Sequence, residues 1–270
     1  MRLCEHAISL RLTTLADLLD TGAYLDLVRE AGALGGRAFT TRVDLSGPRQ
    51  PAAPLAPAWL EAHVGAGFHQ STRWALTDDE GGRFELHAHL HPYTGVYVTQ
   101  VEWRLPEARF EDEAFVERYV AQAKSWAARS EALTLHAHAT DDDAAQNCDN
   151  ATMLRLGYGV EVDEDTWDVN QNPGREFVRG HFRFVSSWLT YVGADALAIL
   201  ERDEAVNLSG LPSTVRVERT EAGAWVRLYD GPLSPGGADE RSAQGALRAA
   251  LGYDAVVKSS QRMWGYWQRK

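Results

Sequence analysis

The N-terminal part of the chain alternates between strand-like and helix-like hydrophobic patterns. Residues 6–12 alternate apolar and polar side chains, which predicts a strand with one buried face. Residues 15–31 carry leucine and valine at helical spacing behind Thr13 and Thr14, either of which could serve as the N-cap of a helix. Residues 38–45 predict a second strand.

Three strands separated by turns form the clearest β region. Apolar and polar side chains alternate over residues 71–77, 83–91 and 96–105, and turns containing glycine or proline lie between them. This arrangement predicts an antiparallel meander. Prolines between residues 46 and 57 predict a loop before it, and residues 58–64 predict a short helix.

The strongest helix signal covers residues 111–130. Phe115, Tyr119 and Trp126 recur there at helical spacing, with acidic residues in the first turn and basic residues near the end, as the helix dipole favours. Residues 132–139 alternate and predict the strand that follows.

The last third of the chain repeats this mixture of strands and helices. The pattern predicts a strand at 182–192 that Ser186 and Ser187 interrupt, a helix at 194–201, a hairpin of 214–218 with 224–229, and a helix at 239–251. Because several strand pairs are hairpins, we expect an α+β fold, with mainly antiparallel, twisted sheet and helices packed on one face.

The chain is long enough for one large domain or for two sub-domains. We expect an N-terminal α+β sub-domain at residues 1–140, an acidic connecting segment at 141–178 and a C-terminal α+β sub-domain at 179–270. One continuous domain is the alternative.

Charge is concentrated in the predicted connecting segment. The chain has a net charge of −11, and nine acidic residues lie between Asp141 and Asp168, opposed only by Arg155. A solvated loop and a binding face both fit such a run. The candidate partner-binding residues are Asp141, Asp142, Asp143, Glu161, Asp163, Glu164, Asp165 and Asp168.

Composition narrows the classes of protein that fit. A net negative charge argues against general nucleic-acid binding, and no apolar run is long enough for a transmembrane helix. The N-terminus lacks the apolar stretch of a signal peptide. Two cysteines, Cys4 and Cys148, fit a reducing compartment. We therefore expect a cytoplasmic protein that binds neither membrane nor nucleic acid.

Histidines alternate on two predicted strands. His87, His89 and His91 share one face of the first strand, and His136 and His138 share one face of the second. If the two strands are neighbours, these imidazoles could bind zinc or iron together with a nearby aspartate (Asp141 or Asp143). The opposite faces are apolar, which places the histidines on the polar, solvent-facing side and favours a surface position without a cofactor.

Sequence motifs of the common enzyme classes are absent. The chain has no glycine-rich dinucleotide loop, no phosphate-binding loop and no Gly-x-Ser-x-Gly nucleophile motif. The surroundings of Cys148 match no cysteine-protease signature. An enzyme is therefore the less favoured class.

Two stretches in the last third carry a family resemblance. Residues 179–193 read RGHFRFVSSWLTYVG, and a short helix and then the hairpin ending GAWVRLYDGP at residues 223–232 follow. This order resembles the C-terminal half of bacterial immunity proteins of contact-dependent, polymorphic-toxin or type VI secretion systems. The resemblance implies a non-enzymatic protein that occludes a toxin, and it transfers no binding residues.

Three functions stay open on these grounds. The first is an immunity protein that neutralises a cognate toxin through an acidic surface, since an acidic inhibitor would associate rapidly with a basic toxin. The second is a metal-dependent hydrolase or oxygenase that uses His87, His89, His136 and His138. The third is a small-ligand-binding protein with a cavity under the sheet.

Overall fold

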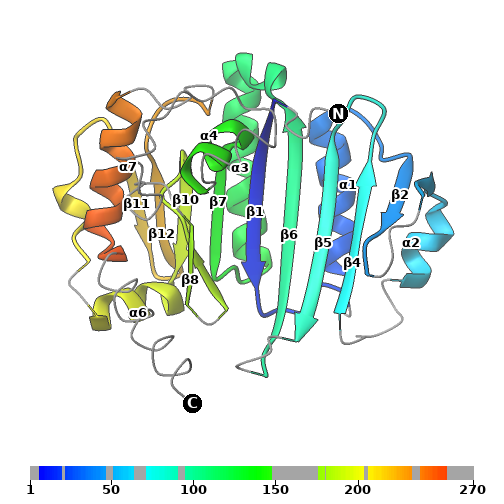
Figure 1. The fold of residues 1–270 in the computed structure, drawn as a ribbon, viewed down its shortest axis with the longest axis horizontal. Helices are drawn as coiled ribbons and strands as arrows, with labels where there is room; N and C mark the ends of the chain where they lie inside the picture. Colours follow the sequence, from blue (N-terminus) through cyan, green and yellow to red (C-terminus); the bar gives the residue numbers. More distant parts are fainter. Residues whose placement is uncertain are drawn as a thin grey trace, which may run out of the picture. The chain divides into compact units, whose positions relative to one another are not determined.

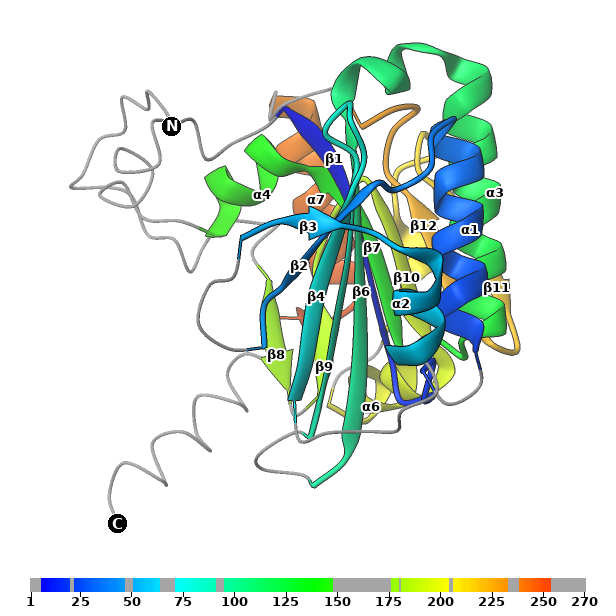
Figure 2. The ribbon, with the colours of Figure 1, turned by 90° about the vertical axis from the view of Figure 1, so that its right-hand side faces the viewer.

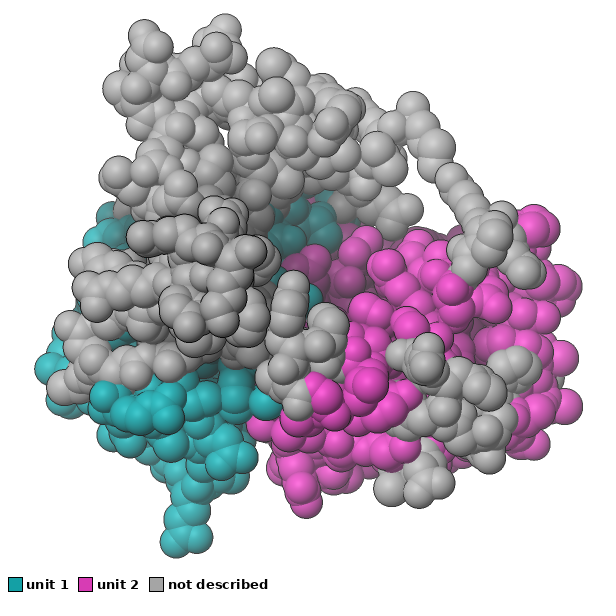
Figure 3. Space-filling view, turned by 60° about the horizontal axis from the view of Figure 1, so that its bottom comes forward, with its two compact units in different colours: residues 1–6, 136–270 teal, residues 7–135 magenta. Residues whose placement is uncertain are grey.

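The computed structural model describes residues 6–19, 22–46, 51–63, 71–90, 95–147, 176–179, 181–203, 206–232 and 238–253. The chain divides into two compact units, which Figure 3 colours separately. One consists of residues 7–135 and is called the 7–135 unit here. The other consists of residues 136–270 together with residues 1–6 and is called the 136–270 unit.

The 7–135 unit is built on an antiparallel sheet. Its strands are β1 (Ala7–Thr14), β2 (Thr41–Asp44), β3 (Ala53–Pro54), β4 (Ser71–Thr77), β5 (Arg83–Leu90), β6 (Tyr97–Pro106) and the first residues of β7 (Thr134–Ala139). They take the order β7-β1-β6-β5-β4-β2-β3 (Figure 1). Neighbours from β1 to β3 in this order pair antiparallel, which confirms the predicted meander.

Helices cover one face of this sheet. The helices are α1 (Ala23–Gly35), α2 (Pro57–His63), the 3-10 turn η1 (Glu107–Glu111) and α3 (Glu113–Arg129). Figure 2 shows α1 and α3 side by side on the same face. Between them and the sheet lies an aromatic core in which Tyr24, Phe84, Trp103, Tyr119 and Trp126 are fully buried. Burying such large side chains is a dominant stabilising contribution.

The first helix begins later than its hydrophobic pattern predicts. The Thr14 hydroxyl accepts a hydrogen bond from the Ala16 amide at 2.9 Å, and the Asp17 carboxylate accepts one from the Leu19 amide at 3.0 Å. Both side chains close local turns, a common alternative to helix capping for threonine and aspartate. The helix starts after Gly22, which adopts a left-handed conformation with φ 71°.

The 136–270 unit contains a second antiparallel arrangement. Its strands β10 (Leu189–Gly193), β11 (Arg216–Thr220) and β12 (Gly223–Arg227) join β7 in the order β11-β12-β10-β7, while β8 (Phe177–Arg179) and β9 (Phe182–Phe184) form a separate hairpin. Its helices are α4 (Thr140–Asn147), α6 (Ala194–Asp203), the 3-10 turn η3 (Leu208–Gly210) and α7 (Ala238–Ala250). A hydrophobic cluster that includes Val192, Leu200, Val226, Leu247 and Tyr253 joins α6 and α7 to β10 and β12.

Two local features of this unit clarify the sequence pattern. The predicted strand at 182–192 is divided at Ser186 and Ser187, whose hydroxyls donate to the carbonyls of Gln244 at 2.6 Å and Leu189 at 2.9 Å. The interruption is confirmed, and the two halves belong to different sheets. Helix α4 occupies the start of the predicted acidic connection, and its three aspartates lie in the first turn, where the helix dipole favours negative charge.

These elements confirm an α+β fold of antiparallel sheet and helices. Cys4 and Cys148 lie outside the described residues. The three-part division of the chain at residues 140 and 178 stays a prediction, because most of the connecting segment lies outside the described residues. Within the described part of the chain, no helix is both long and apolar enough to cross a membrane.

Candidate functional site

The three consecutive aspartates of the acidic segment have different surroundings. Asp142 is buried, with 6% of its surface exposed. It forms an ion pair with Arg241, and it accepts a hydrogen bond from the Gln244 side-chain amide at 2.8 Å. Burial raises the pKa of the Asp142 carboxyl, and the neighbouring Arg241 cation offsets this only in part. The structure thus places Asp142 in the interior, although the charge run predicts a surface position.

The Asp142 contacts belong to a buried polar network between α4 and α7. Gln146 donates to the Gln244 side-chain oxygen at 3.2 Å, and Arg241 donates to the same oxygen at 2.8 Å. Gln146 and Gln244 are almost fully buried. Because buried polar groups are costly unless they are hydrogen-bonded, this network fixes α4 against α7.

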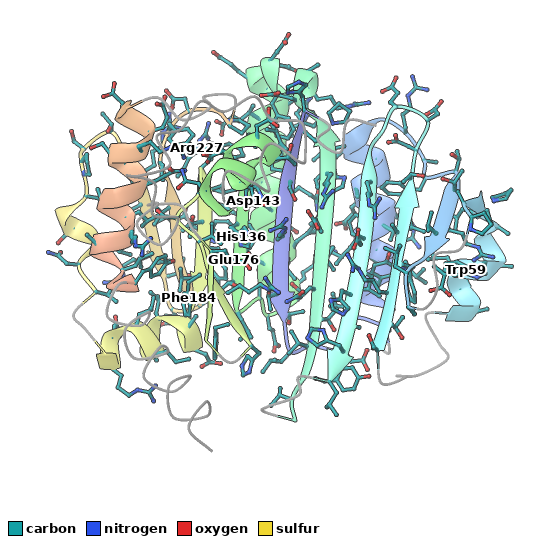
Figure 4. The ribbon with its side chains drawn as sticks, viewed as in Figure 1. Trp59, His136, Asp143, Glu176, Phe184 and Arg227 are labelled. Carbon is teal, nitrogen blue, oxygen red and sulfur yellow. The ribbon has the colours of Figure 1, made fainter. Side chains whose placement is uncertain are left out.

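Two histidines of β7 lie beside the same helix. The rings of His136 and His138 stack with centroids 5.4 Å apart. His138 Nε2 lies 3.6 Å from an Asp143 carboxylate oxygen, and His136 Nε2 lies 4.0 Å from Glu176. Figure 4 shows His136 together with Asp143 and Glu176. We call His136, His138, Asp142, Asp143, Arg241 and Gln244 the α4 cluster.

The solvent-facing position predicted for the β7 histidines is wrong. His136 and His138 are each only 2% exposed, and all six residues of β7 are buried. The polar side of the strand lies beside Asp143 of α4 and beside Glu176, which precedes β8 and also pairs with Arg183. An alternating pattern identifies two faces of a strand but does not report which distant segments cover them.

The other histidines are on β5. The rings of His87 and His89 stack with centroids 4.3 Å apart, and both side chains are half-buried. Strands β6 and β1 separate β5 from β7 in the sheet, so the two pairs are not on neighbouring strands. His91 lies outside the described residues. Among the side chains that the structure describes, no three His, Cys, Asp or Glu are grouped to hold a metal ion.

The polar side of the 7–135 sheet carries a charged network that the sequence patterns did not single out. Glu102 of β6 is 3.3 Å from Arg11 of β1 and 2.7 Å from Arg104, and it accepts a hydrogen bond from Ser9 at 2.7 Å. Glu85 of β5 is bound in the same way by two further arginines. Arg73 of β4 lies at 2.5 Å and Arg83 at 2.7 Å.

The two glutamates are direct cross-strand partners. The register pairs Glu85 with Glu102, and like charges in directly opposite positions are destabilising. Two arginines on each carboxylate offset that repulsion. Burial raises the pKa of Glu102, but Arg11 and Arg104 outweigh this effect and hold the pKa well below its ordinary value. We call Arg11, Arg73, Arg83, Glu85, Glu102 and Arg104 the arginine–glutamate face.

Two short charge motifs in the sequence indicate part of the arginine–glutamate face. The motifs Arg83-x-Glu85 and Glu102-x-Arg104 place opposite charges on the polar side of adjacent strands. Identifying the pairs also requires the cross-strand register, which depends on the turns as well as on the pattern.

A largely apolar groove lies elsewhere on the 7–135 unit. Its volume is about 680 Å³, and Leu25 and Val28 of α1, Phe39, Leu55 and Leu60 contribute to its lining. This volume lies within the range of ligand pockets. The groove borders α1 and α2, and the small-ligand hypothesis stays a prediction.

The two remaining aspartates of the α4 turn are partly accessible. Asp141 accepts a hydrogen bond from His6 at 3.0 Å and keeps 32% of its side chain exposed, whereas Asp143 keeps 20%. The other candidate partner-binding residues, Glu161, Asp163, Glu164, Asp165 and Asp168, lie outside the described residues.

Comparison with known proteins gives one informative likeness. No family model matches the sequence, and no curated protein matches it. Four solved protein chains match the structure. One of them is the Pseudomonas aeruginosa T6SS protein PA0821, with a TM-score of 0.60 and 15% sequence identity over 93% of this chain and 79% of that chain. At this level of identity the likeness shows a shared fold, so the chain has the fold of a type VI secretion system protein.

Proposed function

We propose that this chain is a non-enzymatic immunity protein that binds and neutralises a cognate toxin. The observation that carries the proposal is the fold shared with a T6SS protein over 93% of the chain. The C-terminal strand, helix and hairpin that resemble immunity proteins support the same reading, since all three elements are present as β10, α6 and the β11–β12 hairpin.

The chemistry of the described residues is compatible with a binding protein. The conspicuous polar groups are held in internal pairs, such as Asp142 with Arg241 and Glu85 with Arg73. Such pairs fix side chains in place, and a preorganised charged surface reduces the entropic cost of binding a protein. It also increases association rate and specificity.

The acidic segment supplies one candidate contact surface. We propose that Glu161, Asp163, Glu164, Asp165 and Asp168, with the partly exposed Asp141 and Asp143, face a basic toxin. Asp142 is excluded from this contact because it is buried against α7. Concentrated negative charge would accelerate association with a cationic partner.

Co-expression tests the function. The product of the neighbouring gene is expressed in a bacterial host with and without this chain, and the two proteins are then purified together. We expect growth to be restored and the proteins to elute as one complex. A toxic product whose effect this chain leaves unchanged, or one that does not associate with it, would contradict the proposal.

Charge reversal tests the acidic surface. Replacing Glu161, Asp163, Glu164 and Asp165 by lysine should weaken toxin binding at least about tenfold and flatten its salt dependence. The matched control reverses four exposed glutamates elsewhere in the chain, namely Glu113, Glu117, Glu218 and Glu221. An equal loss in both variants would mean that only net charge matters and would remove the assignment of this surface.

A further inference from the structure

The arginine–glutamate face has its charges arranged in two levels. The Glu85 side chain is only 7% exposed and that of Glu102 is 18% exposed, whereas the four arginine side chains range from 29% for Arg11 to 48% for Arg73. The carboxylates therefore lie deeper than the guanidinium groups. The layer that meets solvent is cationic.

The sign of this face differs from that of the whole chain. Even without Arg11, three arginines against two glutamates leave the face with a net charge of +1, whereas the chain carries −11. If its only role were to hold the sheet together, two arginines would neutralise the two carboxylates. The additional positive charge points to an anionic binding partner.

The guanidinium groups are also fixed in orientation. Arg73 donates to Glu85 through Nε and Nη2, Arg83 does the same, and Arg104 donates to Glu102 through Nε. A guanidinium has five N–H donors, so each of these arginines keeps donors for a further acceptor. Arginine binds carboxylates with paired, parallel hydrogen bonds when its plane is already oriented.

We propose that the arginine–glutamate face is an interaction surface that binds an acidic segment of a protein partner. Carboxylate side chains of that segment bind the outward N–H groups of Arg73, Arg83 and Arg104. A short acidic protein segment fits better than a long nucleic acid, because it brings fewer negative charges against the overall charge of −11. The identification of the partner as a toxin rests on the proposed function, but the carboxylate specificity does not.

A peptide-binding measurement on the full-length chain tests the proposal. The probe is a fluorescein-labelled octaglutamate peptide, followed by fluorescence anisotropy at low salt. The test variant carries Arg73→Gln and Arg104→Gln, which removes one cation from each glutamate and leaves Arg83 and Arg11 in place. Each carboxylate therefore keeps one partner, and the fold should be retained, which circular dichroism checks.

A matched control removes the same charge from the same unit. Arg29→Gln and Arg118→Gln alter helices α1 and α3, where the two side chains are 74% and 57% exposed and each pairs with one aspartate. We expect the test variant to bind the peptide about tenfold more weakly and the control to bind within about twofold of the unaltered chain. If the test variant does not fold, Arg73→Gln alone is compared with Arg29→Gln, and the same ordering is expected.

Several outcomes would overturn the proposal. They are equal weakening in the test and control variants, absence of octaglutamate binding, and tighter binding of a DNA oligomer than of the peptide. The proposed function fails separately, when the unaltered chain forms no complex with a toxin. Octaglutamate binding that depends on Arg73 and Arg104 would stand even then.

Discussion

The histidine pairs of β7 and β5 have the same alternating sequence pattern but differ in burial. Strand β7 carries His136 and His138 at alternate positions, and β5 carries His87 and His89 in the same way. The β7 pair is fully buried beside Asp143 and Glu176, whereas the β5 pair is half-buried on the polar side of its sheet.

This difference shows what an alternating pattern can and cannot report. The pattern fixes which side chains share a face, and both pairs do stack on one face. Exposure depends on segments that return to cover that face. The buried members of the α4 cluster therefore contribute to the stability of their own unit, whereas the arginines of the arginine–glutamate face are partly exposed to solvent.

The largest expected effect comes from the cation of the α4 cluster. Arg241→Met should destabilise the protein by about 3 kcal/mol, because it leaves the buried Asp142 carboxylate without its ion-pair partner. Urea unfolding measures the loss, and Arg29→Met on exposed α1 is the control, with an expected change below about 0.5 kcal/mol. A loss below about 1 kcal/mol for Arg241→Met would contradict the buried position of the pair.

The same variant has a defined pH dependence. Burial raises the pKa of Asp142 above its ordinary value of 3.8, so the folded protein binds a proton that the unfolded chain has released at the same pH. Lowering the pH through that raised pKa neutralises the carboxylate and relieves its cost. We therefore expect the destabilisation by Arg241→Met to shrink in acid.

The next effect compares the two histidine pairs directly. His138→Ala should cost about 2.5 kcal/mol, since it opens a cavity in a buried strand and removes the neighbour of Asp143. His87→Ala should cost about 0.5 kcal/mol, because that ring is half-buried. Urea unfolding of both variants under one condition measures the difference. Equal losses would mean that β5 and β7 are covered alike.

A smaller effect than that of His138→Ala is expected at the arginine–glutamate face. Glu102→Gln should cost about 1.5 kcal/mol at neutral pH, because it leaves Arg11 and Arg104 without their shared carboxylate. The pKa of Glu102 is depressed, so its stabilisation is fully present above the ordinary value of 4.5 and is lost as the pH falls toward the folded-state pKa.

The difference in stability between the unaltered chain and Glu102→Gln should therefore narrow below pH 4.5. For Glu102 the cause is a lowered pKa, whereas for Asp142 it is a raised one. Thermal unfolding across the acid range measures this narrowing, and Glu218→Gln on exposed β11 is the control. A difference that is constant with pH would show that Glu102 is not held ionised by its arginines.

Much of the fold could be predicted from local sequence information. The meander of β4, β5 and β6 follows from the strict alternation of apolar and polar residues and from the glycine and proline residues in the turns between the strands. The break at Ser186 and Ser187 was also visible, because two adjacent serines interrupt an apolar run. The start of α1 was mispredicted, since Thr14 and Asp17 can close a turn as readily as they cap a helix.

The candidate sites depended on information that is distant in the sequence. Asp142 pairs with Arg241, which lies almost a hundred positions further along the chain, and no local pattern indicates that contact. The arginine–glutamate face combines residues from four strands, and only the register brings Glu85 opposite Glu102. Charge counting therefore selected the acidic segment and did not reveal the cationic face.

The most direct test of the central claim is a calorimetric titration of the purified toxin into this chain at low and moderate salt. We predict a one-to-one complex whose affinity falls as salt increases, as expected for a partner recognised through charged surfaces. The absence of any binding to a toxin that is active in the same buffer would contradict the account.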